Sequence, residues 1–237
     1  MTKTEFLLIG SRQRHLNISE SPNIVIDGKP VKQVTVTKSL GVEIDKHLNW
    51  GNHINAISKK IASGIGAMKR IRHLVPREIL LNVYNSLVQP YFDYCSAVWG
   101  NCGSGLSEKL QKLQNRAARI ITFSNYDAPA EPLRCFLNWK TLDVQRSIDK
   151  SILMFKSLHN LAPKYLTSKF VHRSDITSYS VRNAESKLAV PLPRTEFGKR
   201  SFRYSGAVLW NSLPSDIRQI SSLPVFKKKV QSHKFTG

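Results

Sequence analysis

The spacing of the apolar residues changes near residue 50, and this change constrains the fold more than any other feature of the sequence. In the stretch SLGVEIDKHLNW, residues 39–50, Leu40, Val42 and Ile44 alternate with polar residues or glycine, the two-residue period of a half-buried strand. Beyond Trp50 the apolar period becomes three to four residues, as on one face of a helix. The members of that face are Ile54, Ile57, Ile61, Ile65, Met68 and Ile71. The chain is therefore predicted to pass from a sheet directly into a long helix.

Residues 1–46 are expected to form a small antiparallel sheet. Two alternating runs flank Asp27-Gly28, a pair that suits the type I′ turn of a hairpin. The stretches EFLLIG and SLGVEI would supply further strands, the second with Leu40, Val42 and Ile44 turned inward.

Residues 47–125 are expected to form a helical bundle. After the first helix, Pro90 should kink or split the second one, and a third helix is predicted from Leu106 to Ile121. Gly64 and Gly66 weaken the first helix but allow close packing. Three consecutive helices with short links make a bundle.

Residues 126–237 form a basic extension with a mixed, mostly helical pattern. A helix is predicted from about Thr141 to Leu161, followed by a short strand in SKLAVPLP. The stretches FRYSGAVLWNSLP and PVFKKKVQSHKF are expected to be helical. The predicted fold class is therefore α+β, mainly α.

The charge balance indicates a polyanionic partner. The chain has 36 Lys and Arg against 16 Asp and Glu, a formal net charge of +20, and the excess is spread over both halves. Self-repulsion of this size disfavours a compact state unless an anion relieves it. Nucleic acid is the expected partner; an anionic membrane face is the rarer alternative, and no membrane association is predicted. No stretch approaches the roughly 20 apolar residues that cross a bilayer.

The expected location is intracellular, either cytoplasmic or nuclear. The amino terminus has only the short apolar run FLLIG and so does not look like a secretory signal. Cys95, Cys102 and Cys135 form no CxxC pair and cannot all pair with one another, so reduced thiols are expected and a zinc site is not.

Four cations of the third helix form the most specific local pattern. Lys109, Lys112, Arg116 and Arg119 step by three, four and three residues and so share one face, opposite the leucines. A phosphate backbone would turn their mutual repulsion into attraction. An ordinary solvated helix face is the alternative. Further basic groups favour the first interpretation: Lys59, Lys60, Lys69, Arg70, Arg72, Lys227, Lys228 and Lys229.

The residues alone indicate no active site. His47 and His53 have no acidic or cysteine partner at helical spacing, and Glu43 and Asp45 share a strand face without an Asp-Asp companion. Two-metal polymerases and nucleases hold their ions with clustered carboxylates. A surface carboxylate pair is therefore expected, and a small basic nuclease that uses Glu43 and Asp45 stays as an alternative. No dinucleotide, P-loop, serine-hydrolase or zincin motif occurs.

The order of several stretches resembles the reverse transcriptases of non-LTR retrotransposons, the LINE-type, jockey-like elements. The stretches are KTEFLLIG, SLGVEIDKHLNWGNHI, LLNVYNSLVQPYFDYCSAVWG, KLQKLQNRAARIIT and VLWNSLPSDIR. The resemblance implies that residues 1–46 are the closing edge of a polymerase palm, with Lys3 as a remnant of the palm lysine. It also implies that Leu40-Gly41 lies near the primer end and that residues 47–125 are a thumb gripping template and primer. The implied ligand is RNA or an RNA–DNA or DNA duplex.

The departure from that family concerns catalysis. The aromatic-Ala-Asp-Asp motif of the family lies before KTEF and does not occur in this sequence. The expectation is a truncated fragment that is not an enzyme as it stands and needs no cofactor, Mg²⁺ belonging only to the intact parent enzyme. The alternative is a domesticated helical module that binds nucleic acid or protein without a polymerase role. The sequence carries no indication of the oligomeric state.

Overall fold

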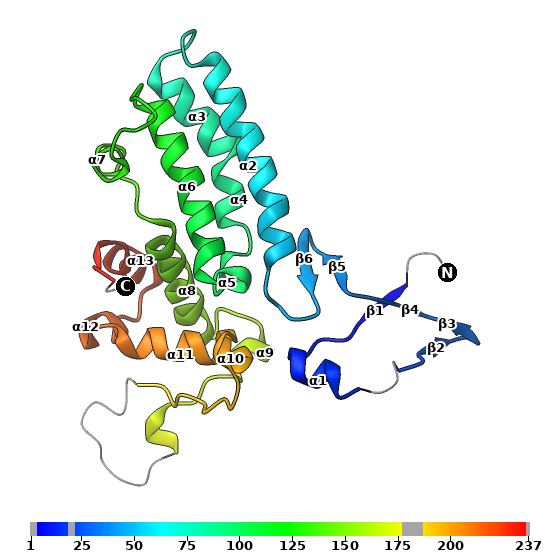
Figure 1. Ribbon diagram of the computed structural model, residues 1–237. Helices are drawn as coiled ribbons and strands as arrows, with labels where there is room; N and C mark the ends of the chain where they lie inside the picture. Colours follow the sequence, from blue (N-terminus) through cyan, green and yellow to red (C-terminus); the bar gives the residue numbers. More distant parts are fainter. Residues whose placement is uncertain (1–3, 19–21, 177–186, 236–237) are drawn as a thin grey trace. The chain divides into compact units, whose positions relative to one another are not determined.

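The computed structural model describes residues 4–18, 22–176 and 187–235. Its regular structure is mainly helical with a few short strands (Figure 1), which confirms the predicted α+β, mainly α class.

Packing divides the chain into two compact units. Unit one contains residues 1–94 and 102–133, and unit two contains residues 95–101 and 134–237. The division expected from the sequence, with boundaries after residues 46 and 125, stays a prediction.

Unit one begins with short strands arranged in pairs. The elements are β1 Glu5–Leu7, α1 Arg12–Leu16, β2 Val25–Ile26, β3 Lys29–Pro30, β4 Lys32–Val34, β5 Val36–Ser39 and β6 Val42–Asp45. Instead of one antiparallel sheet they form three two-stranded ladders, β2–β3 and β5–β6 antiparallel but β1–β4 parallel. An alternating pattern shows which face of a strand is covered but not which strand is its neighbour, and so it could not reveal this pairing. The hairpin at Asp27-Gly28 is confirmed, with φ values of 50° and 73°.

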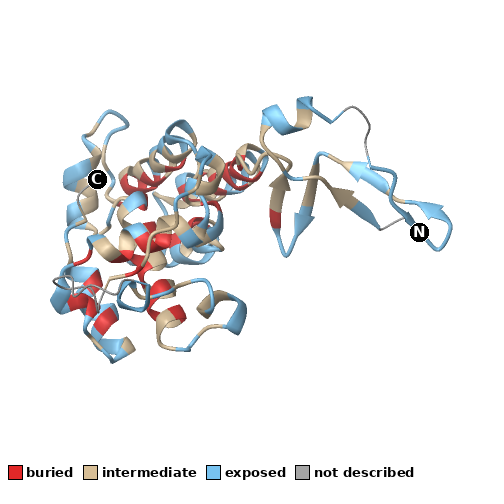
Figure 2. Cartoon of the chain, turned by 90° about the horizontal axis from the view of Figure 1, so that it is seen from below, coloured by how far each residue is buried: buried red, intermediate tan, exposed pale blue. Residues whose placement is uncertain are grey.

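The turn between β5 and β6 corrects the expectation that Leu40 faces the core. Leu40 and Gly41 have φ values of 46° and 83°, as in the turns that match the twist of hairpin strands. Leu40 is 87% exposed, whereas Val42, the first residue of β6, is 5% exposed. The chain reverses at Leu40, so its side chain leaves the face that the alternation assigned to it. Figure 2 shows how little of this strand region is buried.

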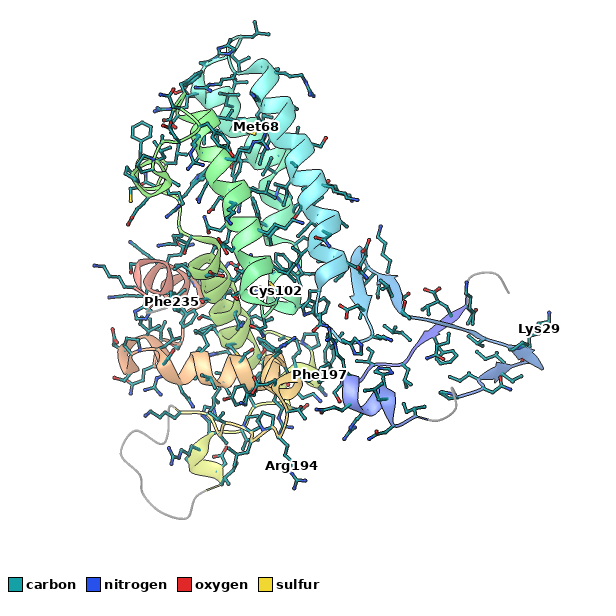
Figure 3. The ribbon with its side chains drawn as sticks, in the orientation of Figure 1. Lys29, Met68, Cys102, Arg194, Phe197 and Phe235 are labelled. Carbon is teal, nitrogen blue, oxygen red and sulfur yellow. The ribbon has the colours of Figure 1, made fainter. Side chains whose placement is uncertain are left out.

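The helical bundle of unit one is built as the three-to-four-residue period predicts. It contains α2 Gly51–Ile71, α3 Arg77–Leu87, α4 Gln89–Asp93 and α6 Ser104–Ile121. The predicted inner face of α2 is buried from Ile54 to Met68, a residue labelled among the helices in Figure 3. Leu80 and Tyr84 of α3 and Leu110 of α6 complete this core. Burial of the Tyr84 phenol raises its pKa.

Pro90 splits the second predicted helix, as expected. Helix α3 ends at Leu87, and α4 begins at Gln89, with Pro90 in its first turn. Proline fits there because the first helical amides have no partner within the helix.

Unit two is a second helical core. Its elements are α5 Ser96–Trp99, α8 Leu142–Leu158, α9 Lys164–Thr167, the 3₁₀ turn Arg173–Asp175, α10 Glu196–Lys199, α11 Phe202–Ser212, α12 Ser215–Arg218 and α13 Leu223–Ser232, while α7 Ala130–Phe136 runs across the division. Helix α8 confirms the predicted helix, and the Thr141 side chain caps it by accepting from the Val144 amide. In this core the Phe226 ring stacks on Trp210 and packs at a tilt against Phe155.

The predicted strand SKLAVPLP is almost absent. In its described part only Leu188 pairs as a strand residue, through an isolated bridge to His172. None of the helices in the described residues has the length and apolar character needed to span a membrane.

Candidate nucleic-acid interface

On α6, the third predicted helix, the cations and the buried residues lie on different faces, but the expectation that the leucines lie opposite the cations is wrong for Leu113, which is half-buried and lines the same hollow as the cations. Leu110, Ala117 and Ile120 are buried, whereas Lys109, Lys112 and Arg116 are exposed and Arg119 is half-buried. This arrangement follows directly from the 3.6-residue repeat, because positions three and four apart share one face.

Helix α2 turns the basic face of α6 into a groove. The groove has a volume of about 820 Å³, and no carboxylate is among its described lining residues. Those residues are Asn55, Ser58, Lys59, Ala62, Gly105, Lys109, Lys112, Leu113, Asn115, Arg116, Arg119 and Tyr126. The lining runs along α6 from Gly105 to Arg119, which at 1.5 Å per residue is a length of about 20 Å. Five cations therefore share one elongated hollow.

The groove cations differ in the hydrogen bonds and ion pairs that they make within the protein. Within the described chain, the side chains of Lys59 and Arg116 make no hydrogen bond or ion pair. Lys109 Nζ donates to Asn55 Oδ1 at 2.7 Å. Lys112 Nζ lies 2.8 Å from Glu108 Oε1, and both side chains are well exposed, so this pair can open at little cost.

Arg119 has a structural role in addition to its charge. Its Nε donates to the Ala128 carbonyl oxygen at 2.8 Å, and so it holds the loop that follows α6. Arg72 supports the same loop, because its guanidinium lies 5.4 Å from the centre of the Phe123 ring and 3.5 Å from the Ser124 carbonyl oxygen.

Gly41 and Lys60 line a second, smaller cleft in unit one. This cleft has a volume of about 390 Å³ and is lined by Lys38, Gly41, His53, Ile57, Lys60, Ser86, Leu87, Pro90, Tyr91 and Tyr94. Lys60 Nζ lies 5.5 Å from the centre of the Tyr91 ring. The Tyr94 hydroxyl donates to the Leu40 carbonyl oxygen at 2.7 Å and so fixes the exposed β5–β6 turn beside the cleft.

The other sequence-predicted cations lie outside both hollows. Lys69 and Arg70 are exposed in the last turn of α2, and Lys227, Lys228 and Lys229 are exposed on α13 in unit two. Lys3 lies outside the described residues.

Of the two carboxylates considered as metal ligands, that of Asp45 is bound to backbone amides. Asp45 Oδ1 accepts from the amides of His47 and Asn49 at 3.0 and 3.2 Å. The Glu43 amide donates to Nδ1 of His53, a buried ring whose pKa is lowered chiefly by that burial. In the part of the chain that the structure describes, no three His, Cys, Asp or Glu side chains lie together as a metal site.

Sequence spacing did not indicate three groove or cleft residues that the tertiary structure supplies. Asn55 and Tyr126 reach the groove from α2 and from the loop after α6, and Lys38 reaches the cleft from β5. No periodic signal connects such residues, because they meet only when separate elements pack.

Comparison with known proteins identifies relatives of one kind. The chain is 30% identical over 130 residues to a protein described as a probable RNA-directed DNA polymerase from transposon BS of Drosophila melanogaster. It is 25% identical over 194 residues to the RNA-directed DNA polymerase from mobile element jockey, and 26% identical over 104 residues to a probable RNA-directed DNA polymerase from transposon X-element, both of the same organism.

The shared region is a small part of each relative. The matches to BS, the X-element and jockey include 52%, 43% and 77% of this chain but 14%, 12% and 19% of the respective relatives. No family model and no solved structure matches the chain. The resemblance found in the sequence is confirmed by these relatives: the chain contains a region related to the RNA-directed DNA polymerases of jockey-like, non-LTR retrotransposons.

Proposed function

We propose that this chain binds nucleic acid by its phosphate backbone, along the groove between α2 and α6, as the thumb part of a reverse transcriptase would. The observation that carries the proposal is the groove itself, with Lys59, Lys109, Lys112, Arg116 and Arg119 along a hollow whose described lining has no carboxylate. Cations held this close repel one another, and a polyanion placed among them removes that repulsion.

The length of the groove supports a backbone ligand. Successive phosphates of one DNA strand are spaced about 3.4 Å apart along the helix axis, so a hollow of about 20 Å accommodates several. Two cations without a partner in the described chain, Lys59 and Arg116, are available to them directly.

The β5–β6 turn provides a second contact in the proposal. Leu40 is exposed at a strained φ, and Gly41 and Lys60 line the cleft beside it. A strained, exposed apolar residue without a packing role is compatible with contact to a ligand. Sequence preference is expected to be weak, since phosphate contacts position a protein without reading bases.

We further propose that this chain does not synthesise DNA by itself. Phosphoryl transfer with two metals needs clustered carboxylates, and Asp45 is already bound to backbone amides. We expect no primer extension with Mg²⁺ or Mn²⁺. Extension that survives repurification and disappears in Glu43→Gln would contradict this; Asp45 is unsuited to the control because its loss disturbs the fold.

The salt dependence of binding tests the groove. The test variant carries Lys59→Gln, Lys109→Gln, Lys112→Gln and Arg116→Gln and keeps Arg119, which holds the loop after α6. If each residue meets a phosphate, the slope of log K against log salt on duplex flattens by about three to four units. Gln is a good helix former, so circular dichroism should stay unchanged.

A matched variant separates contact from long-range attraction. Arg12→Gln, Arg14→Gln, Lys29→Gln and Lys32→Gln remove the same charge from exposed positions on α1, β3 and β4, outside the groove. We expect a much smaller change of slope. A folded groove variant with the slope of the unmodified chain would refute the proposed interface.

A further inference from the structure

Tyr126 is an exposed aromatic ring on the wall of the basic groove. Tyr126 is 85% exposed, and it lines the groove together with Arg116 and Arg119. A single exposed ring needs no explanation by itself. The ring of Tyr126, however, lies beside the groove in which nucleic acid is proposed to bind.

The loop that carries Tyr126 is fixed on both sides of the ring. On one side the Ser124 amide donates to the Arg119 carbonyl oxygen at 3.0 Å, and the Thr122 and Ser124 hydroxyl oxygens lie 2.8 Å apart. On the other side the Ala128 carbonyl oxygen accepts from Arg119 Nε at 2.8 Å. The Ala128 amide also donates to the Asn125 carbonyl oxygen at 3.3 Å.

A second arginine holds the same loop from α2. The guanidinium of Arg72 lies over the Phe123 ring, 5.4 Å from its centre. The aromatic ring three residues before Tyr126 is therefore occupied within the protein, whereas Tyr126 is open to a ligand. A ring on a held loop loses little conformational entropy when it binds, so the platform is preorganised.

We propose that Tyr126 stacks on an unpaired base of a strand whose phosphates lie in the groove, so that the ligand is single-stranded nucleic acid or the unpaired end of a duplex. This rests on the proposed function and makes it more specific. The bases inside a continuous duplex are already stacked on both faces and present only their edges, so a ring beside the backbone cannot stack on them. Stacking on an aromatic side chain tolerates any base, which agrees with the weak sequence preference expected of the groove.

The test compares three labelled ligands of equal length with the full chain: a single strand, a duplex with a single-stranded overhang, and a blunt duplex. Fluorescence anisotropy gives Kd for the unmodified chain, for Tyr126→Ser and for Tyr126→Phe. We expect Tyr126→Ser to raise Kd for the single strand and the overhang by about fivefold or more, and to change Kd for the blunt duplex by less than about twofold. Tyr126→Phe keeps the ring and should bind like the unmodified chain.

Tyr165→Ser is the matched control, because Tyr165 is also a well-exposed tyrosine but lies on α9, outside the groove. It should leave all three affinities unchanged. A 2-aminopurine base placed at an unpaired position of the ligand should lose fluorescence through stacking when the ligand binds the unmodified chain. Tyr126→Ser should abolish that loss of fluorescence.

Two results would overturn the inference: an unchanged affinity of Tyr126→Ser for the single strand, or an equal loss on the blunt duplex. Either can occur while the four-Gln groove variant still flattens the salt slope, and then only the role of Tyr126 is refuted. A groove variant with an unchanged slope refutes the proposed function itself.

Discussion

Lys150 Nζ donates a hydrogen bond to Asn101 Oδ1 at 2.5 Å in unit two. The Asn101 amide nitrogen donates in turn to the Arg200 carbonyl oxygen at 2.7 Å and to Ser205 Oγ at 3.0 Å. These bonds tie Asn101, two residues after α5, to α8 and α11, although α5 lies between α4 and α6 in the sequence. Lys150 is the ionisable member of this network.

The stability of unit two should therefore rise with pH in the alkaline range. Burial, with a smaller contribution from the charge of Arg146, lowers the pKa of Lys150 from 10.5 to about 8. Below pH 8 both folded and unfolded chains carry the proton, and the full cost of burying it is present. Between about pH 8 and pH 10.5 the unfolded chain binds more protons, so the free energy of unfolding increases with pH.

Lys150→Gln should flatten this increase, as measured by urea denaturation at about pH 7.5 and about pH 9.5. Lys156→Gln on the same helix is the control, because the Lys156 side chain has no hydrogen bond or ion pair among the described residues, and it should keep the increase. An identical pH dependence in Lys150→Gln and the unmodified chain would show that Lys150 is not the group responsible.

Two glycines of α2 should respond differently to substitution by alanine. A Cβ at Gly66 would have no atom within 4 Å, so Gly66→Ala should stabilise the chain by about 0.5–1 kcal/mol through helix propensity. A Cβ at Gly64 would lie 3.0 Å from Val88 Cγ2 and 3.3 Å from the Leu87 carbonyl oxygen. The free energy of unfolding of Gly64→Ala, measured by urea denaturation, should therefore be lower than that of Gly66→Ala by more than about 0.5 kcal/mol. Equal gains would mean that α2 and α3 do not pack this closely.

Leu40→Asn should make the chain more stable and its binding weaker. A non-glycine residue at a left-handed φ costs roughly 1–2 kcal/mol, and asparagine tolerates this region, so a gain of about 0.5–1 kcal/mol is expected. Leu74→Asn is the control, since Leu74 is 80% exposed but is not among the residues with positive φ, and its stability should barely change. A gain in stability without any loss of nucleic-acid affinity would remove Leu40 from the proposed interface.

Asp45→Ala should destabilise the passage from β6 to α2. Oδ1 of the carboxylate accepts hydrogen bonds from the amides of His47 and Asn49, and Oδ2 accepts one from the Trp50 amide at 2.8 Å. Trp50, the residue directly before α2, has a φ of 64°, a conformation that a bulky residue keeps only when it is held. We expect a loss of about 2 kcal/mol or more in unfolding free energy, because three backbone donors lose a charged acceptor.

Asp127→Ala is the control for that substitution. Asp127 is exposed and its side chain has no partner in the described chain, so removing the same charge should change stability by less than about 0.5 kcal/mol. Similar losses in both variants would contradict a special role of Asp45 at the junction.

The local periodicities determined most of the secondary structure. The inner face of α2, the split at Pro90 and the separation of the cations of α6 from its buried residues all follow from the 3.6-residue repeat and from the chemistry of proline. These features depend on residues within a few positions of one another, so an isolated sequence contains the information.

The tertiary structure alone decided which distant residues meet. Lys59 joins the cations of α6, Tyr126 reaches the same groove, and Leu40 leaves the core because the chain reverses there. The short segment of α5 packs with α8 in unit two although its neighbours in the sequence belong to unit one. Such contacts are set by chain reversals and by the packing of whole helices, which no local repeat encodes. The sequence by itself thus determined the helices and the charge they carry, and only the packing decided that these charges line one groove.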